Sequence, residues 1–110
     1  KREDQNYLAV CFGDLLNYGA DDVLKPINPL TYRTPEGDTC LHIAAARNDV
    51  RAVMLLVEAG LDVNAIGDMG NTPLHYASQC KHRGVVAFLI DNGAQPELLN
   101  EFGHKASQTD

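Results

Sequence analysis

Histidine and cysteine are the residues of this chain with the widest chemical repertoire, as acids, bases, nucleophiles or metal ligands. The 110-residue sequence contains four histidines and three cysteines. The closest approach of the two types is Cys80-Lys81-His82, and no second pair follows at the spacing of a zinc site. No recognisable base accompanies Cys11, Cys40 or Cys80. The sequence therefore predicts no metal site, no cofactor and no enzymatic activity.

His42 and His75 are two histidines whose positions correspond. His42 stands at the third position after Thr39, and His75 stands at the third position after Thr72. Either imidazole is chemically able to act as a base or a metal ligand. A histidine that recurs with the same neighbours is more typical of a structural role that is repeated along a chain.

The stretch from residue 37 to residue 103 contains the same pattern twice. The first copy is GDTCLHIAAARNDVRAVMLLVEAGLDVNAIGDM and the second is GNTPLHYASQCKHRGVVAFLIDNGAQPELLNEF. Gly37, Gly70 and Gly103 follow one another at a constant interval, and the same interval separates Gly60 from Gly93. A period in the range of roughly 20–50 residues indicates a solenoid in which one structural unit stacks on the next.

Each copy predicts a pair of helices. In the second copy Thr72 can cap a helix that starts at Pro73, where a missing N–H does no harm. Residues 81–84 interrupt this helix, and the apolar residues between 85 and 90 predict a second one. Gly93 suits the left-handed conformation that follows a helix, as Gly60 does in the first copy. Because one pair cannot bury its apolar face alone, the pairs must stack.

These segments resemble ankyrin repeats. GDTCLHIAAARND and GNTPLHYASQ, each followed by a Leu-Leu or Leu-Ile helix and a helix-ending glycine, have the period and the TPLH-type tetrapeptide of that family. The resemblance implies an all-α fold, an ankyrin-repeat solenoid of stacked helix–turn–helix pairs with projecting β-hairpin loops. It also implies that His42 and His75 bond their threonines and nearby backbone to hold the turn.

We expect a single ankyrin-repeat domain over residues 1–110. Its expected parts are a degenerate repeat with a long loop (1–33), two full repeats (34–66 and 67–99) and a partial repeat (100–110). Two registers compete in the first part. Aligning Gly19 with Gly60 makes residues 11–18 an outer helix, whereas aligning residues 9–14 with residues 44–49 makes the segment an inner helix.

The connection from Gly19 to Gly60 is longer than the interval from Gly60 to Gly93. The surplus falls in residues 22–33, DVLKPINPLTYR, where Pro26 and Pro29 oppose a helix. Two interpretations are open. The loop either folds its apolar residues back onto the stack, or it is an enlarged finger that contacts a partner.

Repeat proteins bind partners on a concave surface, which the ankyrin resemblance builds from hairpin tips and the exposed side of the inner helices. On this basis the predicted partner-binding residues form two groups. The hairpin positions are Glu36, Asp38, Asp68, Met69, Asn71, Glu101, Phe102 and His104, and the inner-helix positions are Arg47, Tyr76, Gln79 and Cys80. Acid at the rim with apolar anchors is typical of protein-binding surfaces.

Composition narrows the kind of partner. A formal net charge of −6 argues against a nucleic-acid surface and suits a basic protein. No apolar run approaches the ~20 residues of a membrane span, so we expect no membrane partner. Because no catalytic site is predicted, we also expect no small-molecule substrate. Three cysteines without a spaced framework favour free thiols in a reducing compartment, and hence a cytoplasmic location.

These observations together predict a non-enzymatic protein–protein interaction module. The alternative is narrower: a small acidic inhibitor or immunity-type protein that binds and blocks an enzyme or toxin with a basic active site. The acidic hairpin positions and the enlarged loop at residues 22–33 motivate this alternative.

Overall fold

The computed structural model describes residues 2–15 and 27–107. This part of the chain contains five α-helices, one short 3-10 helix and no β-strand beyond isolated bridges. The helices are α1 (Arg2–Cys11), α2 (Cys40–Ala46), α3 (Val50–Glu58), α4 (Pro73–Gln79) and α5 (Arg83–Asp91), and the 3-10 helix is η1 (Asp68–Gly70). The prediction of an all-α fold is confirmed.

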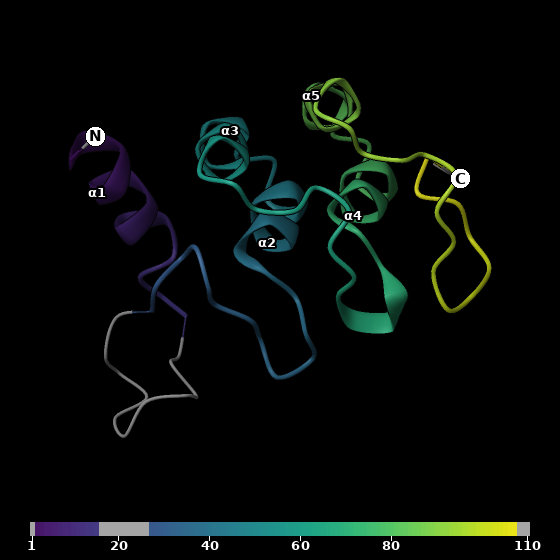
Figure 1. Cartoon of the computed structure of the whole chain (residues 1–110), viewed down its shortest axis with the longest axis horizontal. Helices are drawn as coiled ribbons and strands as arrows, with labels where there is room; N and C mark the ends of the chain where they lie inside the picture. The colour runs from purple at the N-terminus through teal and green to yellow at the C-terminus, as the bar shows by residue number, and fades with distance from the viewer. Residues whose placement is uncertain (1, 16–26, 108–110) are drawn as a thin grey trace.

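The helices stack in two rows (Figure 1). The inner row consists of α2 packed on α4, and the outer row of α3 packed on α5. Within each repeat the inner helix also packs on its outer helix, α2 on α3 and α4 on α5. Loops project from the inner row on the side away from the outer helices. This arrangement is the predicted solenoid.

Both inner helices begin with the same capping arrangement. The Thr39 hydroxyl accepts a hydrogen bond from the backbone N–H of His42 at 3.4 Å, and the Thr39 N–H donates to His42 Nδ1 at 3.0 Å. Thr72 and His75 repeat this exchange at 3.3 and 2.9 Å. Each box satisfies two donors that a helix start leaves unpaired. The predicted structural role of the two histidines is confirmed.

A glycine follows each outer helix, and a carboxylate caps the start of α3. Asp49 caps α3 by accepting the N–H of Ala52 at 3.0 Å. Past the ends of α3 and α5, Gly60 and Gly93 hold φ values of 104° and 100°, the left-handed region that favours glycine. The prediction that these two glycines end the outer helices is confirmed.

The core is a continuous layer between the two rows. Leu41 and Leu74 of the inner helices and Leu56 and Leu89 of the outer helices are fully buried. Val53 is buried with them. Burial of this kind is shared between neighbouring repeats, because each interface uses the apolar faces of two units.

The N-terminal helix α1 packs against the outer helix α3. It ends at Cys11, where the second of the two registers aligns the end of an inner helix, although its neighbour belongs to the outer row. Residues 12–15 are not helical, and residues 16–26 lie outside the described part. The helix buries Leu8, and Phe12 beyond its end is also buried.

Residues 27–33 are the described part of the long connection. Asn28 forms a turn in which its carbonyl accepts the N–H groups of Thr31 and Tyr32. Ile27 and Tyr32 pack against the core, whereas Leu30 is 46% exposed. Folding back onto the stack therefore holds for two apolar residues of this segment, and its contact with a partner stays a prediction. No helix in the described residues is long and apolar enough to cross a membrane.

Candidate functional site

Three hairpin loops project from the stack, one at each step of the repeat. One backbone hydrogen bond closes each loop: Thr34 N–H to Asp38 O, Gly67 N–H to Asn71 O, and Asn100 N–H to His104 O, at 2.8, 2.8 and 3.0 Å. Antiparallel bridges flank the first and third loops. We call loops 33–39, 66–72 and 99–105 the first, second and third hairpin, and their combined surface the hairpin face (Figure 1).

Asp38 joins the first hairpin to the second repeat. Its Oδ1 accepts the N–H of Asp68 at 2.9 Å, and both of its carboxylate oxygens lie 3.0 Å from the Tyr76 hydroxyl. Burial and the hydrogen bond to Asp38 raise the pKa of Tyr76. The sequence predicts that Asp38 and Tyr76 contact a partner, but their polar groups are engaged inside the stack.

The second and third hairpins are joined in a similar way. The N–H of Glu101 donates to the carbonyl of Met69 at 2.9 Å, and Asn100 Nδ2 donates to Asn71 Oδ1 at 2.9 Å. The carbonyl of Asn71 accepts from His42 Nε2 at 2.9 Å. Asn71 is only 8% exposed. It is therefore a structural residue of the stack, which corrects its prediction as a contact residue.

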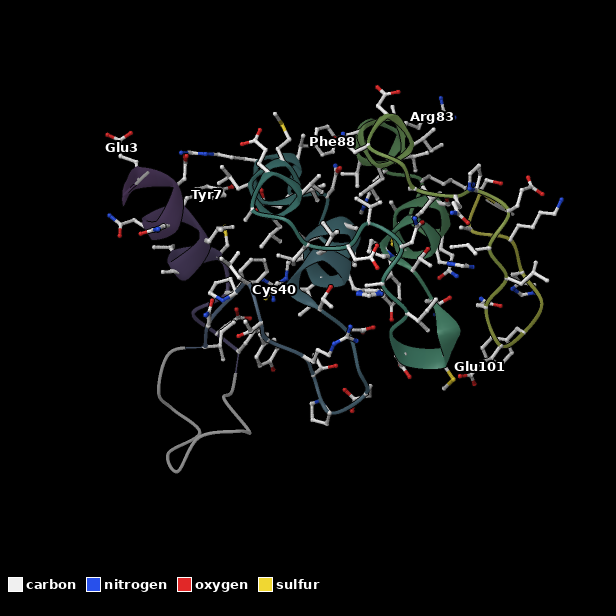
Figure 2. All side chains as sticks on the ribbon, viewed as in Figure 1. Glu3, Tyr7, Cys40, Arg83, Phe88 and Glu101 are labelled. Carbon is white, nitrogen blue, oxygen red and sulfur yellow. The ribbon has the colours of Figure 1, made fainter. Side chains whose placement is uncertain are left out.

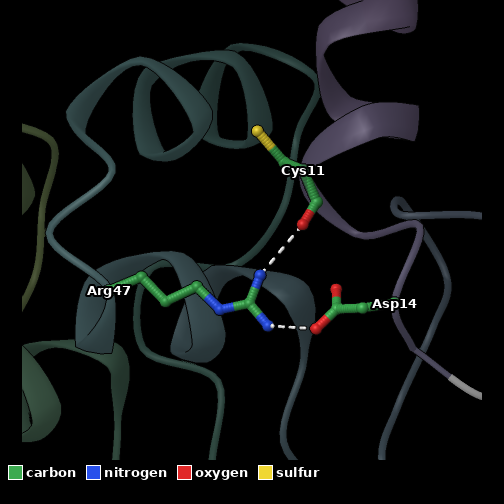
Figure 3. A network of polar contacts seen from close by, with 3 residues as sticks. All are labelled: Cys11, Asp14 and Arg47. Atoms are coloured by element: carbon green, nitrogen blue, oxygen red, sulfur yellow. Dashed lines mark hydrogen bonds and ion pairs between the residues drawn. The ribbon is translucent and has the colours of Figure 1, made fainter.

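Arg47 fastens the end of α2 to the N-terminal turn (Figure 3). Its guanidinium donates to the carbonyl of Cys11 at 2.9 Å and to the carboxylate of Asp14 at 3.0 Å. The same group lies 5.9 Å from the centre of the Phe12 ring. The side chain remains partly exposed, but its charge is paired within the chain. Arg47 thus joins the end of α2 to the N-terminal segment, a contact that the sequence did not suggest.

The remaining predicted residues are accessible. Glu36, Met69, Gln79, Cys80, Glu101, Phe102 and His104 are exposed, and Asp68 is half-buried. Glu101 lies at the tip of the third hairpin beside η1 (Figure 2). The ring of Phe102 lies 6.3 Å from that of His104. The ion pairs found among the described residues include none of Glu36, Asp68 and Glu101.

Two exposed residues of this surface were missed by the sequence-based prediction. Ile66 and Leu99 open the second and third hairpins and are 54% and 58% exposed. They are one period apart, and Arg33 is the corresponding residue of the first hairpin. The repeat arithmetic could have found them, because the same spacing relates Glu36, Met69 and Phe102.

The cysteines and histidines with shifted pKa values are held in their neutral forms. Burial raises the pKa of the Cys40 thiol to about 12 and also raises the pKa of Cys11. Burial lowers the pKa of His42 and of His75, so both remain neutral hydrogen-bonding groups. In residues 2–15 and 27–107 no group of three or more His, Cys, Asp or Glu side chains gathers as a metal site would require.

Comparison with known proteins gives the same picture. A family model of ankyrin repeats, in three copies, matches residues 7–100. The fission-yeast (Schizosaccharomyces pombe) Ankyrin and IPT/TIG repeat-containing protein C26H5.05 is 41% identical over 69 residues, which cover 63% of this chain and 6% of that protein. Human Ankyrin repeat domain-containing protein 40 is 42% identical over 69 residues, covering 62% of this chain and 19% of that protein.

A third relative is Protein phosphatase 1 regulatory subunit 12A of the mouse (Mus musculus), 39% identical over 70 residues, which cover 64% of this chain and 7% of that protein. The matched region is therefore a small part of each relative. The family match itself extends over most of the chain and over both complete helix pairs. The chain belongs to the ankyrin-repeat family.

Proposed function

We propose that this chain is a non-enzymatic module that binds another protein through the hairpin face and the adjoining exposed residues of the second inner helix. Ankyrin repeats are generally protein–protein interaction modules. One relative is by name a regulatory subunit of a protein phosphatase. The observation that carries the proposal is the row of three hairpins that are tied to one another while their tips stay accessible.

The hydrogen bonds between neighbouring hairpins favour binding of a partner. Asp68 N–H to Asp38 and Glu101 N–H to Met69 hold neighbouring tips at fixed positions. A surface whose backbone is already ordered loses less conformational entropy when a partner docks, so more of the contact energy appears as affinity. The hairpin face is therefore preorganised for recognition.

Charge selects the class of partner. The carboxylates of Glu36, Asp68 and Glu101 have no cationic partner among the described residues, and the whole chain carries a formal net charge of −6. Unpaired carboxylates on a projecting surface attract positive groups and accelerate the encounter with them. A basic protein is accordingly the partner that this surface favours.

The test is to identify binders from a display library of protein fragments from the cell of origin and to compare two charge-reversal variants. E36K/D68K reverses charge on the hairpin face, and E58K/D91K makes the same change at the ends of α3 and α5, on the outer row. Titration calorimetry should show binding about tenfold weaker for E36K/D68K and within about twofold of the parent for E58K/D91K.

Two results would count against this function. Equal affinities of the two variants would place the binding surface elsewhere. A large fall in the thermal midpoint of E36K/D68K alone would show that these positions support folding instead of contacts. The parent protein is also expected to bind its partner more weakly at high salt than at low salt, because salt screens the attraction between exposed charges.

A narrower candidate is an inhibitor of an enzyme with a basic active site, and the unpaired hairpin carboxylates favour it. In that case the protein found by display is an enzyme whose activity falls in proportion to the amount of complex. Full activity of the enzyme in a saturated complex would exclude inhibition while leaving protein binding intact.

A further inference from the structure

Exposed apolar side chains gather on two of the three hairpins. Nine large hydrophobic residues are exposed in the described part of the chain, and four of them belong to the second and third hairpins. These four are Ile66, Met69, Leu99 and Phe102. The first hairpin has Arg33 and Glu36 at the corresponding positions. The second and third hairpins thus carry exposed apolar side chains where the first hairpin carries charged ones.

The tips of the second and third hairpins are in direct contact. The carbonyl of Met69 accepts the N–H of Glu101, so the residue after Glu101, Phe102, lies near the turn that carries Met69. Met69 is 48% exposed and Phe102 is 65% exposed. Neither exposed side chain contributes much to the folded core. Large contiguous apolar patches are unusual on the surface of a monomer and often mark a binding site.

The backbone of Met69 adds a second observation. Its φ and ψ are 58° and 22°, in the left-handed region that a residue with a bulky side chain rarely occupies. Glycine or asparagine would meet this turn with less strain. The left-handed turn therefore does not favour methionine at this position.

A carboxylate residue precedes each member of this apolar pair in the sequence. Asp68 precedes Met69, Glu101 precedes Phe102, and none of the ion pairs among the described residues includes either one. The nearby cations are engaged elsewhere: Arg33 donates to the carbonyls of Gly37 and Ile66, and Lys105 pairs with Glu97. An apolar centre thus stands beside carboxylates that form no ion pair with the described residues.

We infer that the tips of the second and third hairpins bind a protein segment in which a bulky apolar side chain stands next to lysine or arginine. The apolar side chain packs between Met69 and Phe102, and the cation pairs with Asp68 or Glu101. Further basic residues of the segment extend towards Glu36 on the first hairpin. This inference rests on the proposed function and specifies the chemistry of the partner at that surface.

The test uses a phage-displayed library of random peptides of about twelve residues, selected on the full chain. Peptides that carry Leu, Ile, Met, Phe or Trp beside Lys or Arg should be enriched. Synthetic copies of the enriched peptides are then titrated by fluorescence polarisation against M69N/F102N, in which asparagine tolerates the left-handed turn. We expect binding at least about tenfold weaker, as for the loss of a central apolar anchor.

A matched variant controls for the loss of exposed apolar surface in general. M54Q/I90Q replaces two large exposed apolar side chains of the outer helices, Met54 and Ile90, which are 39% and 40% exposed. It should bind the peptides within about twofold of the parent. Circular dichroism melts of both variants verify that they remain folded, which is expected because neither changes a buried residue.

Enrichment of acidic or purely polar peptides would overturn the inference, and so would peptides that bind M69N/F102N as tightly as the parent. This failure is distinguishable from failure of the proposed function. If E36K/D68K still loses its natural partner while M69N/F102N binds that partner unchanged, the hairpin face binds protein but not through the apolar pair. If both variants keep full affinity for the natural partner, the proposed function fails too.

Discussion

At the scale of single residues, the structure identifies positions where the side chain conflicts with the backbone. Asn48 and Lys81 both follow an inner helix, and both hold a φ of 60°. Asparagine tolerates the left-handed region better than lysine does, because its short polar side chain can bond locally. The conflict is therefore larger at Lys81, whose side chain is exposed.

We predict that Lys81→Gly raises the free energy of unfolding by about 1 kcal/mol, because glycine removes the strain of the left-handed turn. Urea denaturation followed by circular dichroism measures the change. Asn48→Gly serves as the control and should gain less. Equal gains at the two sites, or no gain at Lys81, would contradict this account of the turn.

Gly67 is needed for a different reason. Its φ of −117° is open to any residue, but a Cβ built on it would clash with Asp38 Oδ1 and would lie 2.8 Å from His42 Nε2. Both of those atoms take part in hydrogen bonds between repeats. The absence of a side chain thus allows the first and second hairpins to approach.

Gly67→Ala should therefore lower the free energy of unfolding by about 1–3 kcal/mol, as overpacking commonly does. Gly84→Ala is the matched control, because a Cβ on Gly84 meets nothing within 4 Å and alanine favours the helix. That control should be neutral or stabilising. A melting temperature of G67A equal to that of the parent would show that the hairpins separate without cost.

At the scale of elements, the capping boxes link each inner helix to the next hairpin. His42 Nδ1 accepts from Thr39, while its Nε2–H donates to Asn71 O in the second hairpin. His75 makes the corresponding contacts with Thr72 and with the carbonyl of His104. Each imidazole must be neutral for this, since a second ring proton would remove the acceptor for the threonine N–H.

Stability should consequently fall as the solution becomes acidic. Burial lowers the pKa of His42 and His75 in the folded state below the ordinary value of 6.5. Well above pH 6.5 both histidines are neutral in the folded and in the unfolded protein, so they do not make the free energy of unfolding depend on pH. Below pH 6.5 the unfolded chain binds protons that the folded chain does not, so the free energy of unfolding decreases.

Urea titrations between pH 7.5 and 5 measure this decrease. The double variant H42Q/H75Q is the control, because glutamine cannot titrate, and its stability should depend less on pH in that range. A parent protein that becomes more stable between pH 6.5 and 5 would refute the assignment of neutral, capping histidines.

The outer helices show what a periodic pattern can and cannot predict. The apolar residues 52–57, which correspond to residues 85–90 of the second copy, lie in α3 as the repeat predicts. The pattern led us to expect that Leu55 is buried, but Leu56 is fully buried while Leu55 is only half-buried. The difference arises because adjacent helical positions are turned by about 100°, and the packing of α2 and α5 decides which one is covered.

At the scale of the whole molecule, α1 is attached to the stack through Asp49. The Tyr7 hydroxyl donates to Asp49 Oδ1 at 2.8 Å and the Cys11 thiol donates to Oδ2 at 3.2 Å. Figure 2 shows Tyr7 between α1 and α3. The hydrogen bond to Asp49, followed by that to Cys11, raises the pKa of Tyr7 to about 12. Arg51 lies over the Tyr7 ring at 4.2 Å.

A double-mutant cycle of Tyr7→Phe and Asp49→Ala should give a coupling energy of about 1 kcal/mol, as for one hydrogen bond to a charged group that stays partly exposed. Asp49→Ala alone should cost more than Tyr7→Phe alone, because Asp49 also caps α3. Equilibrium denaturation of the four proteins provides the values. Strict additivity would mean that the Tyr7–Asp49 hydrogen bond does not help to hold α1 on the stack.

The sequence by itself determined the period, the helix pairs, the capping threonines and histidines, and the glycines that end the outer helices. Apart from the period, which comes from comparing the two copies, these features depend on residues within a few positions of one another. The hairpins followed from the family resemblance. The accessible tips at Met69 and Phe102 were predicted as well, because they flank the periodic glycines.

Only the tertiary structure decided which predicted contact residues are occupied within the chain. Asp38 bonds Tyr76, Asn71 bonds Asn100, and Arg47 bonds Asp14. Each of these partners is distant in the sequence and lies on the neighbouring repeat or beyond the connecting loop. A local pattern predicts a helix or a turn, but it cannot show which side chains meet when one repeat is laid against the next. The stacking sets those distances, and the stacking therefore separates the residues that hold the solenoid from those whose side chains stay exposed.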